Sequence, residues 1–296
     1  MKKNHDRVNE PRRRLGITAT RRITNTFVYF LLVVMTVVWL FPFFGIVMES
    51  FKVDTNGAMD GKLIPGQFGF DNYIRLFTKT NFLIWFRNTA LMGVFTALFQ
   101  TLFVLMMSYT LSRLRFNGRK LLMNVMLILG MFPGFLTLVL IYKVFSDWGL
   151  YMEKAPIGLI IVYCASSGMG YYVSKGFFDT IPKSLDEAAR IDGATRMQIL
   201  YRVILPLAKP IVIYTILSAF MAPWGDFVFA RYISMNNVDG MTVAVGLNNW
   251  LNADQIAYKY TQFCAGGVLV ALPVTLLFMF LQKYYVEGVT GGAVKG

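Results

Sequence analysis

Apolar and polar residues alternate along this chain in long blocks. Six blocks of roughly 20 or more apolar residues are each long enough for a helix to cross about 30 Å of hydrocarbon at about 1.5 Å per residue. They cover residues 26–48, 89–111, 121–144, 157–177, 211–233 and 261–284. Strands of a transmembrane barrel alternate in short segments, which these blocks do not do. The pattern predicts an all-α polytopic membrane protein with six transmembrane helices.

The composition agrees with this class. The chain is 56% hydrophobic and 15% charged, whereas soluble domains carry about 25% charged residues. Both cysteines, Cys164 and Cys264, fall inside predicted spans. We interpret them as small buried apolar residues, so that neither a disulfide framework nor a metal site is expected.

The charge distribution orients the predicted spans. The first 25 residues, two of the connections and the tail, with the adjoining span ends at Lys175 and Lys283, would share one side of the membrane if the spans alternate. That side carries 20 basic and 7 acidic residues, a net charge of +13, whereas the remainder carries nine of each. The positive-inside rule places this side, with both termini, in the cytoplasm. A basic arm can also bind nucleic acid or anionic lipid, but the orientation bias accounts for the charge without either partner.

The same interpretation divides the chain into an arm and a membrane domain. A basic cytoplasmic arm covers residues 1–25 and a membrane domain covers residues 26–296, with outer loops at 49–88 and 234–260. The first apolar run is too long for a cleavable signal peptide, so it is expected to be a retained span. In the first outer loop, a short helix is expected with Asp71 as its cap. The second loop is rich in amides and holds Trp250, groups that suit sugars, although a plain polar surface loop fits equally well.

The groups needed for catalysis are missing from this sequence. His5 is the one histidine, and it lies in the basic arm. No H-E-x-x-H, paired-cysteine or acidic-dyad pattern occurs in the spans, and no G-x-x-x-x-G-K-[ST] phosphate loop is present. An enzyme is therefore disfavoured, no cofactor is expected on this chain, and any ATP-driven step must use another polypeptide.

A few residues inside the spans are candidates for lining a pathway. Asp226 is the one acid well inside a predicted span, and an intramembrane ionisable residue is a functional hypothesis by default. A structural ion pair with Arg231 and a pathway-lining role are both open for it. Prolines in transporter spans often mark broken helices. The pathway candidates are Pro133, Trp224 and Asp226.

A polar segment, residues 184–206, interrupts the apolar pattern on the predicted cytoplasmic side. Ser184 and Glu187 have the spacing of a capping box, followed by a first helix. Gly193 permits a sharp reversal with positive φ. A second helix is expected from Thr195 to about residue 203, stopped by Leu205-Pro206.

Such a helix-turn-helix beside the membrane has two interpretations. It can dock into a groove on a partner, or it can rest on lipid as an interfacial helix. Lipid-surface helices are usually rich in Lys and Arg, so the acids Asp186, Glu187 and Asp192 favour the partner.

The residues of this segment also resemble a known family. Glu187-Ala-Ala-Arg-Ile-Asp-Gly193-Ala194 with Ile204-Leu-Pro206 is similar to the coupling motif of type I ABC importer permeases. Thr242-Val-Ala-Val-Gly246 and the closing stretch Gly288-Val-Thr-Gly-Gly-Ala-Val-Lys-Gly296 resemble the carbohydrate branch, and most of all the MalG-type subunits of maltose/maltodextrin transporters. The similarity covers roughly residues 26–296.

The resemblance implies a type I ABC importer permease fold and a set of partners in the cell membrane. These are a second, MalF-like permease subunit, two ATPase subunits that bind ATP and Mg, and an extracytoplasmic sugar-binding protein. Alternatives are a permease for galacto- or raffinose-type oligosaccharides or glycerol phosphate, or a non-transport membrane scaffold.

The resemblance also implies roles for individual residues. The expected ATPase-coupling residues are Glu187, Ala188, Ala189, Arg190, Asp192, Gly193, Ile204, Leu205 and Pro206. The expected ATPase-contacting tail residues are Gly291, Gly292, Lys295 and Gly296. The expected binding-protein and sugar-release residues are Asn248, Asn249, Trp250, Asn252 and Asp254.

Overall fold

The computed structural model describes residues 17–53, 58, 61–131, 134–166 and 168–293, and these are almost entirely helical. The longer helices are α1 (Ile17–Ser50), α3 (Phe82–Arg113), α4 (Arg119–Gly130), α5 (Gly134–Trp148), α6 (Ala155–Ala165), α7 (Gly168–Asp179), α11 (Lys209–Gly225) and α14 (Ala253–Ala293). The short ones are α2 (Asp71–Thr78), α8 (Lys183–Ile191), α9 (Arg196–Ile199), α10 (Leu205–Leu207), α12 (Val228–Ser234) and α13 (Val243–Asn248). Single helical turns are η1 (Met152–Lys154), η2 (Leu200–Ile204) and η3 (Asn249–Leu251). The prediction of an all-α membrane protein is confirmed.

The spans are less regular than the six predicted. Within the described residues, three helices are long and apolar enough to cross a membrane: Thr24–Ser50, Phe82–Arg113 and Gln255–Lys283. Two bent pairs raise the number to five, namely Met152–Ala165 with Gly170–Asp179, bent by 40°, and Arg196–Leu207 with Lys209–Gly225, bent by 88°. The predicted third span is divided between α4 and α5, and the predicted fifth ends at Gly225 rather than at residue 233.

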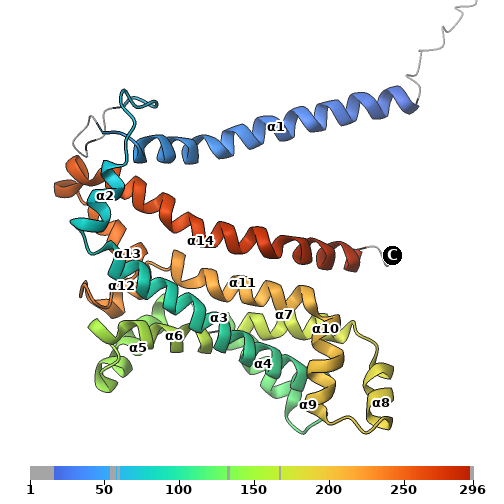
Figure 1. Ribbon diagram of the computed structural model, residues 1–296. Helices are drawn as coiled ribbons and strands as arrows, with labels where there is room; N and C mark the ends of the chain where they lie inside the picture. Colours follow the sequence, from blue (N-terminus) through green and yellow to red (C-terminus); the bar gives the residue numbers. More distant parts are fainter. Residues whose placement is uncertain (1–16, 54–57, 59–60, 132–133, 167, 294–296) are drawn as a thin grey trace, which may run out of the picture.

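The helices form an elongated bundle with distinct ends (Figure 1). The start of α1 and the end of α14 lie at the end that carries α8, α9 and α10, while α2, α12 and α13 lie at the other. Helix α3 runs between the two ends and packs against α6, α7 and α11. Helix α1 contacts α14 and otherwise diverges from the bundle, with large apolar side chains exposed along its length.

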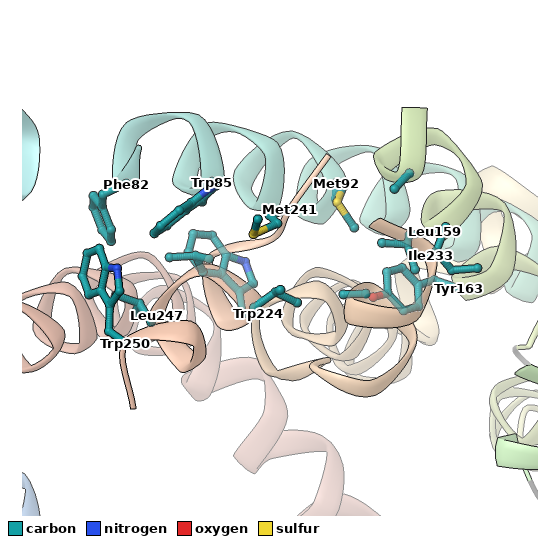
Figure 2. Packing of buried hydrophobic residues seen from close by; sticks show 14 of the residues in the cluster. Phe82, Trp85, Met92, Leu159, Tyr163, Trp224, Ile233, Met241, Leu247 and Trp250 are labelled. Atoms are coloured by element: carbon teal, nitrogen blue, oxygen red, sulfur yellow. The ribbon is translucent and has the colours of Figure 1, made fainter. Parts of the chain in front are cut away.

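Two apolar cores stabilise these ends. The larger one, around the first half of α3, combines Phe82, Trp85, Trp224, Met241 and Trp250 (Figure 2). The smaller one joins Tyr109 of α3 and Phe178 of α7 to the α9–α10 region. Both cysteines are buried, and neither forms a disulfide.

Buried polar contacts tie the C-terminal end of α1 to the bundle. The Asn72 amide donates to the carbonyl oxygens of Ser50 (3.1 Å) and Lys52 (2.7 Å), and its oxygen accepts from Thr261 of α14 at 2.9 Å. Lys52, almost fully buried, lies 2.5 Å from Glu49. Helix α2 is present as predicted, but its N-cap is Phe70 and no side chain caps it, so Asp71 belongs to the first turn and is not the cap.

Candidate functional site

The 184–206 segment forms a helix-turn-helix, beginning with α8. The predicted capping box at Ser184 and Glu187 is wrong, because α8 begins at Lys183 with Pro182 as N-cap and no side-chain cap. Pro182 has φ −56°, which its ring fixes, and an extended ψ of 131°, which keeps it outside the helix, so α8 starts directly after it. Ser184 then lies inside the first turn, where its side chain does not act as the cap.

The reversal after α8 confirms the predicted role of Gly193. This residue has φ +81° and follows the C-cap Asp192. The Gly193 amide donates to the Arg190 carbonyl (3.0 Å) and the Ala194 amide to the Ala189 carbonyl (2.9 Å). This pair of bonds is the Schellman motif, which satisfies the last carbonyls of a helix and requires a left-handed residue.

The second half of the segment holds the capping box that α8 lacks. The Thr195 amide donates to the Gln198 side chain (2.7 Å), and the Gln198 amide donates to the Thr195 hydroxyl (3.3 Å). The predicted stop at Leu205-Pro206 is wrong, because α9 continues through the π-helical turn η2 into α10 and ends at Leu207. A π turn accommodates a residue that disturbs the regular ladder, here Pro206 with its missing donor.

The two faces of this segment have different environments. On the inner face, Ile199, Leu200 and Ile204 are buried in the smaller core. On the outer face, Ile191 is 87% exposed and Met197 is 55% exposed. Of the predicted coupling residues, Glu187, Ala188, Arg190, Asp192 and Gly193 are exposed, Ala189 and Leu205 are half-buried and Ile204 is buried.

One ion pair fastens α8 to the bundle. Asp186 is the one buried residue of α8, all of whose residues the structure describes. Its Oδ2 lies 2.9 Å from Nε of Arg113, the last residue of α3. A cavity of about 490 Å³ opens beside this pair. Its charged lining residues are Arg113, Arg115, Arg119, Lys183, Asp186, Glu187, Arg190 and Arg196.

The predicted outer loop 234–260 is not an irregular polar loop. It contains α13, η3 and the first turns of α14, and its apolar residues Met241, Val243, Val245 and Leu247 are buried. Trp250 is 6% exposed, with its ring centroid 5.6 Å from that of Trp85 (Figure 2). Thus Trp250 belongs to the core and does not project from the surface.

The amides of this loop have several environments. Asn249 accepts a hydrogen bond from Arg231 at 2.6 Å, Asn248 is half-buried and Asn252 is exposed. Asp254 lies in the first turn of α14, and its side chain falls outside the described residues. A cavity of about 320 Å³ adjoins Asn249, Trp250 and Tyr258.

The two pathway candidates that the structure describes, Trp224 and Asp226, have different environments. Asp226 occupies the break between α11 and α12, where it accepts hydrogen bonds from the Tyr163 hydroxyl (2.6 Å) and the Phe229 amide (3.1 Å). The alternative of an ion pair with Arg231 is wrong, because Arg231 turns to Asn249. Trp224 is buried in the larger core. Pro133 lies outside the described residues.

The tail continues α14 instead of leaving it. Gly291 and Gly292 belong to α14, which runs to Ala293. Lys295 and Gly296 lie outside the described residues. The sequence reading missed Arg113 and the anchoring role of Asp186, since these residues are 73 positions apart and belong to different helices. The available signal was that Arg113 is a basic residue at the end of an apolar helix, but this signal does not identify Asp186 as its partner.

The described structure is a helical membrane bundle with a helix-turn-helix at one end. Sequence comparison places the chain in a family of membrane transport components. The model of the family described as "Binding-protein-dependent transport system inner membrane component" matches residues 104–291. The chain therefore belongs to this family of multi-pass inner-membrane permeases. Its members are the permease components, with no catalytic ATPase domain and no cofactor of their own. The predicted resemblance to ABC importer permeases is confirmed.

Individual relatives cover nearly the whole chain. The maltodextrin transport system permease protein MdxG of Bacillus subtilis is 33% identical over 282 residues, 95% of this chain and 100% of the relative. The galactooligosaccharides transport system permease protein GanQ of the same organism is 35% identical over 280 residues, 93% of this chain and 97% of the relative. A crystal structure of a bacterial ABC transporter involved in alginate import matches with a TM-score of 0.77 at 22% identity, over 92% of this chain and all of that one. It shows the same fold.

Proposed function

We propose that this chain is the permease subunit of an ABC importer that carries maltodextrin-type oligosaccharides across the cell membrane. It works with a MalF-like permease subunit, two ATPase subunits and an extracytoplasmic sugar-binding protein. The similarity to MdxG supports the substrate. Galactooligosaccharides are the second candidate, because the identity to GanQ is as high.

The exposed outer face of α8 and α9 is the observation that carries this proposal. Ile191 and Met197 leave apolar surface at the end of the bundle, next to the exposed charges of Glu187 and Arg190. A short helix held on one side and exposed on the other suits docking into a groove on a partner. The partner is the ATPase subunit, and this end of the bundle is cytoplasmic, as the charge distribution indicates.

Transport then depends on how tightly this helix is held in each state. ATP-driven closure of the ATPase pair displaces the 184–206 segment, and the bundle follows to open the pathway outward. The segment can couple the two events only if its free energy of docking to the ATPase differs between the two states. The tail that holds Gly291 and Gly292 contacts the ATPase pair as a second attachment.

At the other end, the 234–260 segment contacts the binding protein. Its buried side chains give the segment a fixed shape, and exposed groups such as Asn252 meet the partner. The cavity beside Asn249, Trp250 and Tyr258 offers amide groups and the exposed ring of Tyr258 to a sugar during release.

Reconstitution of the complete complex in lipid vesicles tests this function. We expect ATP hydrolysis to rise when the binding protein is added with maltodextrin, and to rise less with galactooligosaccharide, raffinose or glycerol phosphate. A larger response to galactooligosaccharide would transfer the assignment to the second candidate. Absence of a response to every sugar, or failure of the chain to co-purify with an ATPase, would favour a non-transport scaffold.

A further inference from the structure

Of the three long uninterrupted helices of the described structure, α1, α3 and α14, helix α3 is the one without an internal proline. It has 32 residues, from Phe82 to Arg113. At about 1.5 Å per residue it is about 48 Å long. The neighbouring paths are divided: α4 from α5, α6 from α7 with a bend of 40°, and α11 from α12. A continuous helix transmits a displacement along its axis with little loss, whereas a broken one absorbs it at the break.

The outer end of α3 is fixed to the 234–260 segment by buried contacts. The Asn88 amide donates to the carbonyl oxygens of Asp239 (2.7 Å) and Met241 (3.1 Å). The Thr89 hydroxyl, fully buried, accepts from the Val243 amide at 2.8 Å. These bonds go to the backbone, so they fix the path of the segment whatever its side chains contact.

The other end of α3 is fixed to α8. The Arg113 and Asp186 side chains are 1% and 6% exposed, with 2.9 Å between Nε and Oδ2. Arg113 Nη2 also donates to the Ile181 carbonyl at 2.9 Å, just before α8 begins. The adjoining Ser112 hydroxyl donates to Asp179 at 2.6 Å.

A buried ion pair contributes little net stability but fixes the relative position of its partners, because separating them leaves a charge uncompensated. Asp186 is the one buried residue of α8. The pair is therefore the main constraint that makes α8 move together with α3.

We propose that α3 connects the 234–260 segment to α8 as one rigid element, with Arg113 and Asp186 as positioning residues at one end and Asn88 at the other. This inference rests on the proposed function. Docking of the loaded binding protein displaces the outer end, and α3 carries the displacement to the ATPase contact. The coupling is reciprocal, so closure of the ATPase pair changes the affinity for the binding protein by the same factor.

The test uses the complete complex in lipid vesicles and measures the ratio of ATP hydrolysis with and without the sugar-loaded binding protein. We expect Asp186→Asn to lower this ratio about fivefold or more, because typical allosteric couplings change an affinity by at least about that factor. Asp186→Glu is expected to retain most of the stimulation. Arg113→Lys is expected to lower the ratio too, since a single ammonium cannot both pair with Asp186 and donate to the Ile181 carbonyl as two separate guanidinium nitrogens do. Arg113→Lys keeps the positive charge beside Asp186, so this variant still tests the proposal if the complex with Asp186→Asn does not assemble.

Two comparisons make the result decisive. Arg115→Gln removes an exposed charge from the same cavity and is expected to leave the ratio unchanged; an equal fall would assign the effect to the cavity's charge and overturn the proposal. Asn88→Ala is expected to lower the ratio, and its combination with Asp186→Asn to lower it no further. An unaffected Asn88 variant, or multiplying effects, would exclude α3 as the connection. If the unmodified complex shows no stimulation with any sugar, the proposed function fails instead.

Discussion

Gly193 shows how one backbone conformation shapes the exposed segment. Its φ of +81° lies where side chains with a Cβ are strained, and a Cβ placed there would meet nothing within 4 Å. Any effect of a substitution therefore comes from the backbone and not from a clash. The residue sets the angle between α8 and α9, and with it the placement of Ile191 and Met197.

Replacement of Gly193 by valine is expected to abolish sugar uptake while the chain still inserts in the membrane. The left-handed conformation costs a residue with a Cβ about 1–2 kcal/mol, so the turn shifts and α8 is misplaced. Gly193→Asn is the matched control, since Asn tolerates this conformation, and it should retain most uptake. Uptake of labelled maltodextrin by cells, normalised to the amount of chain in the membrane, measures both. Normal uptake by the valine variant would contradict the role given to the turn.

At the scale of elements, Asn72 joins three helices that the sequence separates widely. Its amide nitrogen donates to the Ser50 and Lys52 carbonyls at the end of α1, and its oxygen accepts from Thr261 of α14. Both polar atoms of the side chain therefore have hydrogen-bond partners inside the protein. Removing such a side chain leaves buried backbone carbonyls and a hydroxyl without their partner.

Asn72→Ala is expected to destabilise the protein by about 2–4 kcal/mol, as the loss of several buried hydrogen bonds implies. The loss should appear as a lower midpoint of thermal unfolding in detergent. Asn117→Ala, at an exposed position between α3 and α4, is the matched control and should leave the midpoint unchanged. Equal midpoints for the two variants would mean that Asn72 does not hold α1 to α14.

The elements that could be predicted from the sequence are those set by local pattern. Long apolar runs predicted α1, α3 and α14, and Gly193 predicted the reversal after α8 because only its own conformation is involved. The start of α8 was misread because Pro182 competes with the Ser184 cap. The helices of the 234–260 segment were not predicted because the amides on either side of the short apolar run give the segment the composition of a polar loop. The Arg113–Asp186 and Asn88–Met241 contacts depend on tertiary packing, which no local spacing encodes.

At the scale of the whole molecule, the two cores and the charge distribution distinguish the same two ends of the bundle. The smaller core lies at the end that bears α8, where α1 begins and α14 ends, and the larger core lies at the end with α12 and α13 (Figure 1). The basic excess that the sequence predicts for the cytoplasmic side is expected at the first of these ends. A membrane lying across the bundle would therefore separate Ile191 and Asn117 from Asn252.

Single cysteines at these positions test the topology directly, after Cys164 and Cys264, both buried, are replaced by alanine. A membrane-impermeant thiol reagent added to intact cells or protoplasts is expected to label Asn252→Cys. Ile191→Cys and Asn117→Cys should react only after the membrane is permeabilised, because the positive-inside bias keeps their side in the cytoplasm. When the chain is expressed without its partner subunits, the Ile191 side chain is 87% exposed, so failure to react before permeabilisation reflects the membrane and not burial. Labelling of Ile191→Cys and Asn252→Cys from the same side would contradict this orientation, and with it the assignment of α8 to an ATPase contact.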